Sequence, residues 1–221
     1  ATAAAARGER DFWAGKSTRV DATVLKRYRE AAALAPSSVS VLKLVVRGLA
    51  RAYIADDVEA EKAEVASEFV LFAKRLTSES PEELSWVLPL TEAMGMTPNE
   101  VASLVPDSIQ GLELYARWLL KNDHCEAALS VLDKAQALND ARLEDEKPWT
   151  MGRAAYLARE KREKTNVAQV VDELRLAAYE GLEDDAAVTE VSHRIKAREA
   201  VIHETMIARA DALIAEGGMG A

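Results

Sequence analysis

The residues that most resemble a chemical site are 15–18, Gly-Lys-Ser-Thr, because a phosphate-binding loop ends in this order. A phosphate-binding loop also needs a glycine five residues before the glycine of this motif, so that backbone amides can wrap the phosphates. Counting back from Gly15, that position holds Arg10, and the preceding stretch ATAAAAR does not read as a strand. The spacing therefore argues against nucleotide binding.

Histidine and cysteine predict no metal or nucleophile site. His193 and His203 lie ten residues apart on one predicted helix and would point nearly a right angle apart. His124 adjoins the single cysteine, Cys125, but neighbours in sequence diverge on a helix, so base and thiol would not meet. We expect Cys125 to be a buried structural thiol.

Acidic residues are abundant, but none of their runs forms a pair in an apolar context, and charge runs on helices are usually solvated faces. The sequence therefore predicts no catalytic residue, no cofactor and no metal ligand.

Composition points to packed helices. Of the 221 residues, 49% are hydrophobic but only 5% are aromatic, so small and aliphatic side chains supply the apolar content. Ten glycines and six prolines are few for an all-β fold. No apolar run is long enough to cross a membrane. The sequence begins at Ala1 without an initiator methionine, so we expect upstream residues to have been removed. Localisation stays open, since cytoplasmic and extracytoplasmic settings both fit.

The net charge of -9 is unevenly distributed. Residues 1–40 contain seven Lys or Arg and four Asp or Glu, so the remaining residues contain 21 bases and 33 acids. An acidic body argues against nucleic acid as a partner, because phosphate contacts supply most of that affinity. We interpret residues 1–19 as a basic leader whose Phe12 and Trp13 dock on the first helices.

Helix signals recur along almost the whole chain. The segments SPEE at 80–83 and TPNE at 97–100 read as capping boxes with proline at the first helical position. Apolar periodicity and breakers predict a series of helices joined by short turns. The expected helical segments are 20–36, 39–55, 56–76, 81–94, 98–105, 108–121, 124–138, 148–162, 166–180 and 185–215.

The most informative pattern lies in residues 111–140. Two amphipathic helices flank a polar turn, and Ala128 and Ala135 would let their backbones approach closely. This segment resembles a tetratricopeptide (TPR) repeat, a helix-turn-helix unit of about 34 residues. Asp123 and Asp140 depart from the family, which usually has glycine and proline there. Seven residues match the family's signature positions in order: Leu112, Tyr115, Ala116, Leu119, Ala128, Leu132 and Ala135.

The resemblance implies an all-α fold of antiparallel helix hairpins stacked as a TPR-like right-handed superhelix, or solenoid. The expected organisation is a leader at 1–19, a helical domain at 20–216 and a tail at 217–221. Within the domain, 108–141 is the best-matched repeat and 185–215 is a long C-terminal helix, which could cap the array or pair with another chain.

The resemblance also implies function: a non-catalytic scaffold or adaptor that binds a protein or peptide on the concave face lined by first helices. Trp118 falls just off the apolar face and, if partly exposed, is a candidate contact. Two alternatives stay open, an extracytoplasmic accessory module of a bacterial envelope or polysaccharide system and an all-α enzyme with an acidic site. The candidate binding residues on the best-matched unit are Gln110, Glu113, Arg117, Trp118 and Leu120.

Overall fold

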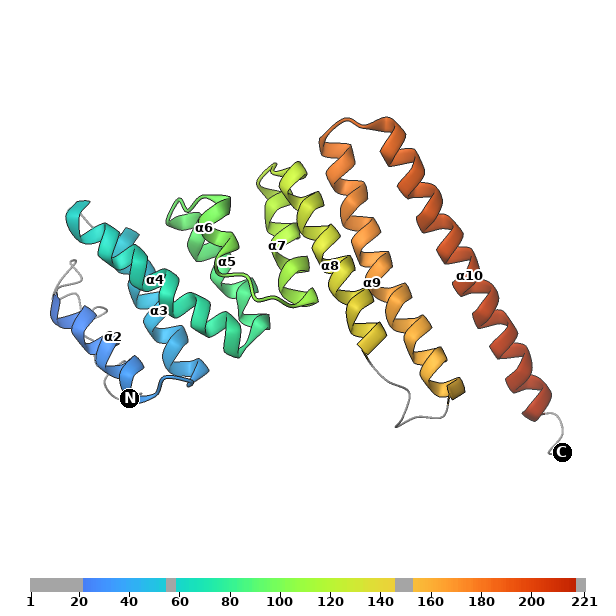
Figure 1. Cartoon of the computed structure of the whole chain (residues 1–221), viewed down its shortest axis with the longest axis horizontal. Coiled ribbons are helices and arrows are strands. Elements are labelled where there is room, and N and C mark those ends of the chain that lie inside the picture. The colour runs from blue at the N-terminus through green and yellow to red at the C-terminus, as the bar shows by residue number, and fades with distance from the viewer. Residues whose placement is uncertain (1–21, 55–58, 146–152, 218–221) are drawn as a thin grey trace. The chain divides into compact units, whose positions relative to one another are not determined.

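The computed structural model describes the backbone of residues 22–54, 59–145 and 153–217, and the side chains of 26–54, 62–142 and 166–207. Every regular element in these ranges is helical, so the predicted all-α class is confirmed for the described part of the chain (Figure 1). The elements are α2 (Ala22–Leu34), α3 (Val39–Ile54), α4 (Glu59–Glu79), the 3-10 helix η1 (Pro81–Glu83), α5 (Leu84–Ala93), α6 (Pro98–Ala102), α7 (Ile109–Lys121), α8 (Cys125–Asp145), α9 (Arg153–Gly181) and α10 (Asp185–Gly217).

The chain divides into two compact units, Ala1–Tyr115 and Ala116–Ala221. The division falls inside α7. The sequence pattern had suggested one helical domain over residues 20–216, whereas the structure distributes those residues over the two units.

In the first unit, α3 packs against α2, α4 and α5. Most of its apolar side chains are buried because helices cover it on several sides, although Ile54 at its end is exposed. The α2–α3 approach is especially close, since a Cβ atom at Gly48 would overlap the ring of Tyr28. An ion pair of Arg29 with Glu64 and Glu68 joins α2 to α4, at 2.6 and 2.5 Å. The largest fully buried side chains of this core include Leu42, Leu49, Phe69 and Leu76.

Two hydrogen bonds, one buried and one partly buried, hold α6 in place. The Thr77 hydroxyl of α4 donates to the carbonyl oxygen of Leu104, just after α6, at 2.6 Å. The Tyr115 hydroxyl of α7 donates to the carbonyl oxygen of Pro98, at the start of α6, at 2.7 Å. This five-residue helix therefore depends on its neighbours for its position.

The two predicted capping boxes differ in outcome. At Thr97 the box is complete, because Thr97 and Glu100 exchange side-chain and backbone hydrogen bonds. At Ser80 the prediction is wrong: the side chain makes no capping bond, and residues 81–83 form η1 before α5 begins at Leu84.

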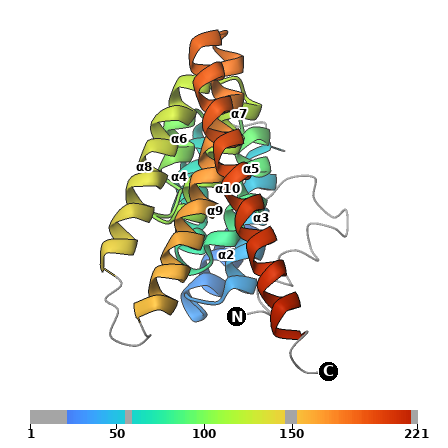
Figure 2. The same ribbon diagram turned by 90° about the vertical axis from the view of Figure 1, so that its right-hand side faces the viewer.

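In the second unit, α9 lies between α8 and α10 and packs against both, as both views show (Figures 1 and 2). The sequence predicted two helices, 148–162 and 166–180, but the structure has one helix from Arg153 to Gly181. Thr165 and Asn166 suggested a helix start, yet neither glycine nor proline interrupts this stretch, and packing on two sides overrides weak local preferences. Residue Trp149 and the predicted start at Pro148 lie outside the described residues.

Three of the helix junctions share one turn geometry, the Schellman motif, in which a residue with positive φ ends the helix. These residues are Gly95 after α5, Asp123 after α7 and Glu183 after α9, with φ of 68, 60 and 57°. In each case the next residue donates its N–H five residues back, as Met96 to Thr91 at 3.0 Å, His124 to Leu119 at 2.9 Å and Asp184 to Tyr179 at 3.0 Å. The pairs α5–α6, α7–α8 and α9–α10 are thus joined by equivalent turns.

Candidate functional site

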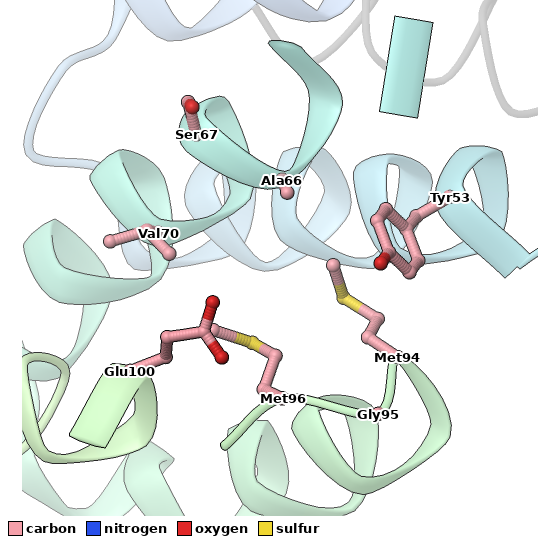
Figure 3. Close-up of a pocket in the computed structure, with 8 residues that line it drawn as sticks. All are labelled: Tyr53, Ala66, Ser67, Val70, Met94, Gly95, Met96 and Glu100. Atoms are coloured by element: carbon pink, nitrogen blue, oxygen red, sulfur yellow. The ribbon is translucent and has the colours of Figure 1, made fainter. Parts of the chain in front are cut away.

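The first unit contains a pocket of about 370 Å³. The end of α3, the first half of α4 and the α5–α6 turn line it (Figure 3). Figure 3 shows Met94 extending toward the ring of Tyr53, while Met96 lies beside the carboxylate of Glu100. The eight lining residues are mostly apolar or small: Tyr53, Ala66, Ser67, Val70, Met94, Gly95, Met96 and Glu100.

The two methionines are placed by the Schellman turn that Gly95 makes possible. Their hydrogen bonds run from Met94 to Leu90 and from Met96 to Thr91, both at 3.0 Å. This backbone geometry does not require methionine, because the equivalent turns carry Asn122 and His124 in one case and Leu182 and Asp184 in the other. The methionines are therefore a local property of the pocket rather than a demand of the turn.

The rim of the pocket is charged at two places. Hydrogen bonds from the side chain and backbone of Thr97 lower the pKa of Glu100, so its exposed carboxylate is ionised at neutral pH. The ammonium of Lys62 lies 5.9 Å from the centre of the Tyr53 ring, within cation–π range. The Ser67 hydroxyl donates to the carbonyl oxygen of Ala63 within α4, so it is already engaged. The pocket therefore has a mainly apolar interior and the carboxylate of Glu100 at its edge.

The pocket was not among the sequence-based candidates, which all lie on α7. Gln110 and Arg117 are exposed there, and Glu113 and Leu120 are half-buried. Trp118 is only 6% exposed, so the partial exposure on which its candidacy depended is not met.

The division of the chain also separates these α7 residues. Gln110 and Glu113 belong to the first unit, and Arg117, Trp118 and Leu120 belong to the second. All five nevertheless lie on one continuous helix, so α7 stays a candidate surface.

The expected burial of Cys125 agrees with the structure. Cys125 is a buried free thiol, 2.6 Å from where a Cβ atom of Gly181 would stand. His124, His193 and His203 are exposed. In the described side chains, no cluster of three or more His, Cys, Asp or Glu residues could hold a metal ion.

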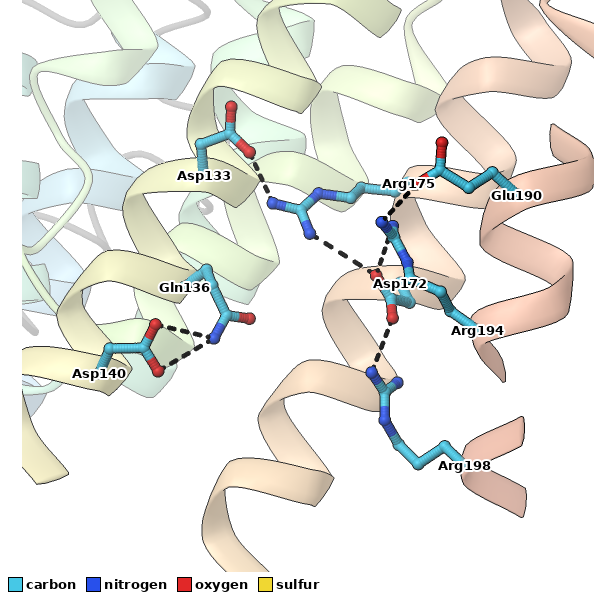
Figure 4. Close-up of polar contacts among 8 residues, drawn as sticks. All are labelled: Asp133, Gln136, Asp140, Asp172, Arg175, Glu190, Arg194 and Arg198. Atoms are coloured by element: carbon cyan, nitrogen blue, oxygen red, sulfur yellow. Dashed lines mark hydrogen bonds and ion pairs between the residues drawn. The ribbon is translucent and has the colours of Figure 1, made fainter. Parts of the chain in front are cut away.

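The second unit contains a buried ionic cluster centred on Asp172 of α9 (Figure 4). Its two carboxylate oxygens accept from Arg194 at 3.1 Å and from Arg198 at 2.9 Å, both on α10. Arg175 lies 3.5 Å from the same carboxylate and also contacts Asp133 of α8 at 2.6 Å. With both oxygens engaged by guanidinium groups, Asp172 acts as a clamp that links α9 to α10.

A second polar residue is buried in α8. Asn139 is fully buried, and neither its amide oxygen nor its amide nitrogen has a hydrogen-bond partner in the described part of the chain. Sequence reasoning missed both Asp172 and Asn139, because an acid or amide on a helix is normally assigned to the solvated face.

The described helices include none long and apolar enough to cross a membrane. No family model, curated protein or solved structure matches this chain, so the site must be interpreted from its own geometry.

Proposed function

We propose that this chain is a non-catalytic protein- or peptide-binding module and that the pocket of the first unit holds an apolar anchor side chain of the partner. One observation carries the proposal: the α5–α6 turn presents Met94 and Met96 to a cavity, although equivalent turns elsewhere in the chain need no methionine. Methionine is flexible and polarizable, which suits surfaces that accept different apolar side chains.

The size and chemistry of the pocket favour an anchor over a metabolite. Its volume of about 370 Å³ lies near the lower end of the range for small-molecule sites, about 300–1,000 Å³. Its ionisable lining residues are Tyr53 and Glu100, which stand on opposite walls rather than as a paired acid and base (Figure 3). A partner segment with a large apolar residue and a nearby basic residue would satisfy both the interior and the edge at Glu100.

The recurrence of one turn in three helix pairs supports the helical-hairpin repeat architecture that the TPR resemblance implies. In such arrays protein binding is the usual role, so the repeat and the pocket support the same class of function. The proposal therefore includes a TPR-like arrangement of the hairpins as part of the scaffold.

The test is peptide selection against the immobilised chain, followed by affinity measurement with single variants. Met96→Asp places in the pocket the residue type that the α9–α10 turn carries at this point, so the turn itself should tolerate it, and thermal unfolding checks the loss of the contact that Met96 makes with the core. We expect selected peptides to lose at least about tenfold in affinity, equal to about 1.4 kcal/mol, from a charge in the apolar site. His124→Asp, the same change at the equivalent position of another turn, is the matched control and should leave affinity unchanged.

Two results would reject the pocket as the binding site. One is a selection that yields no binding peptide, and the other is equal loss of affinity in the Met96 and His124 variants. The α7 residues remain the second candidate surface: if charge reversal at Glu113 and Arg117 weakens the selected peptides while Met96→Asp does not, α7 carries the interaction.

A further inference from the structure

The position of the pocket relative to the start of α2 suggests a specific occupant. Because α2 and α3 form an antiparallel pair with Tyr28 against Gly48, the first residue of α2, Ala22, lies near the level of Tyr53 on α3. Tyr53 is also a wall of the pocket. Ala22, the first described residue after the leader, therefore lies at the level of one wall of the pocket.

That segment has the composition of a pocket ligand. Residues 1–21 contain two aromatic side chains, adjacent to each other at Phe12 and Trp13, and no other large apolar residue except Val20. They also contain four basic residues (Arg7, Arg10, Lys16 and Arg19) and three acidic ones (Glu9, Asp11 and Asp21). The aromatic pair matches the apolar interior, and a basic residue matches the ionised Glu100.

The length of the segment is sufficient. Nine Cα–Cα steps join Trp13 to Ala22, which gives a reach of about 30 Å when the chain is extended. Because α3 packs against both α2 and α5, the path from α2 over α3 to the α5–α6 turn crosses two helix spacings, or about 20 Å, since packed helices lie about 8–10 Å apart.

We propose that Phe12 and Trp13 of the same chain occupy this pocket, so that the leader competes with an external partner for it. This inference rests on the proposed function, because it assigns an intramolecular occupant to the proposed binding site. A tether of this kind gives an effective concentration of about 1 mM. An external peptide would then bind about tenfold more weakly than to an empty pocket if the leader's intrinsic Kd is about 0.1 mM.

The methionines of the pocket provide the test. In the full chain labelled with ¹³C at its methionine methyl groups, an indole ring in the pocket shifts the resonances of Met94 and Met96. Met206, which is 67% exposed on α10 in the second unit, is the internal control. We expect Trp13→Ala to move the two pocket resonances and not that of Met206. A synthetic peptide of residues 7–19, added to the Trp13→Ala chain, should restore them.

Each outcome decides the matter. Unchanged Met94 and Met96 resonances in Trp13→Ala, or an equal change at Met206, overturn the leader as occupant. If selected peptides then still shift Met94 and Met96, with equal affinity for both chains, the proposed function stands and only this inference fails. If the leader peptide restores the resonances but no selected peptide binds even the Trp13→Ala chain, the pocket binds only the leader of its own chain and the proposed function fails.

Discussion

Replacing Gly95 by alanine isolates the energetic cost of the shared turn. Gly95 has φ of 68°, and an added Cβ atom would meet nothing within 4 Å, so the substitution changes backbone strain without a steric clash. A non-glycine residue in this left-handed region costs about 1–2 kcal/mol. About 0.4–1 kcal/mol of that cost is offset, because alanine has fewer conformations than glycine in the unfolded chain and so loses less entropy on folding. The net expected destabilisation is about 1 kcal/mol.

The equivalent positions supply the matched controls. Glu183→Gly should stabilise the α9–α10 hairpin by about 1 kcal/mol, because it removes the same strain. Asp123→Gly should gain less, since aspartate tolerates positive φ better than glutamate does. Gly48→Ala should be worse than Gly95→Ala, at about 1–3 kcal/mol, because its Cβ atom overlaps the Tyr28 ring.

Native-state hydrogen exchange resolves these effects, because it reports the opening free energy of each hairpin separately. A loss of 1 kcal/mol raises exchange through opening about fivefold in the affected hairpin. The reasoning is refuted if Gly95→Ala leaves exchange in α5 and α6 unchanged, or if Glu183→Gly accelerates exchange in α9 and α10. Gly95→Asn, with a residue that tolerates this conformation, should fall between glycine and alanine.

Three further changes test other parts of the structure. Thr97→Ala should cost about 0.5–2 kcal/mol by removing the cap of α6. Because its hydrogen bonds lower the pKa of Glu100 in the folded chain, their contribution is fully present above the ordinary glutamate pKa of about 4.3. The part that the Thr97 hydroxyl donates is lost as the pH falls through the lowered folded pKa, so the stability difference between Thr97→Ala and the native chain in urea unfolding should narrow in acid. Asp172→Leu should lower stability by about 3 kcal/mol, since three guanidinium groups lose their shared carboxylate, and thermal unfolding that is unchanged would contradict the clamp. Asn139→Leu should raise stability by about 1 kcal/mol or more, as a fully buried amide without partners is replaced by an apolar side chain, and a lower unfolding temperature would show that the amide has a partner after all.

The apolar face of α7 and α8 was predictable because it depends on local periodicity alone. All seven residues placed on it by spacing, from Leu112 to Ala135, are buried. The turn was predictable in part, since Asp123 was recognised as standing where glycine is usual, and its φ of 60° gives the physical reason. Whether the hairpins stack as a TPR-like superhelix stays a prediction.

The pocket could not have been found in the same way. Its walls come from Tyr53 on α3, Val70 on α4 and Glu100 on α6, which no sequence window contains together. The one local signal was Met94-Gly95-Met96, two flexible apolar residues around a helix-ending glycine. The division of the chain within α7 has no signal of its own, because the helix continues through it without glycine or proline between Tyr115 and Ala116.

Internal comparison of the three turns separates what the fold needs from what it does not. The fold needs a residue that accepts positive φ, and it tolerates glycine, aspartate or glutamate at that point with different strain. The flanking positions are unconstrained, since methionine, asparagine, leucine, histidine and aspartate all occur there. Around Gly95 the two methionines meet the core as well as the cavity, since Met94 is buried in the core of the first unit, Met96 packs against that core, and both line the pocket. Substituting Met96 should therefore weaken binding while the turn stays intact. Substituting Gly95 should instead lower the free energy of unfolding and leave the other residues that line the pocket unchanged.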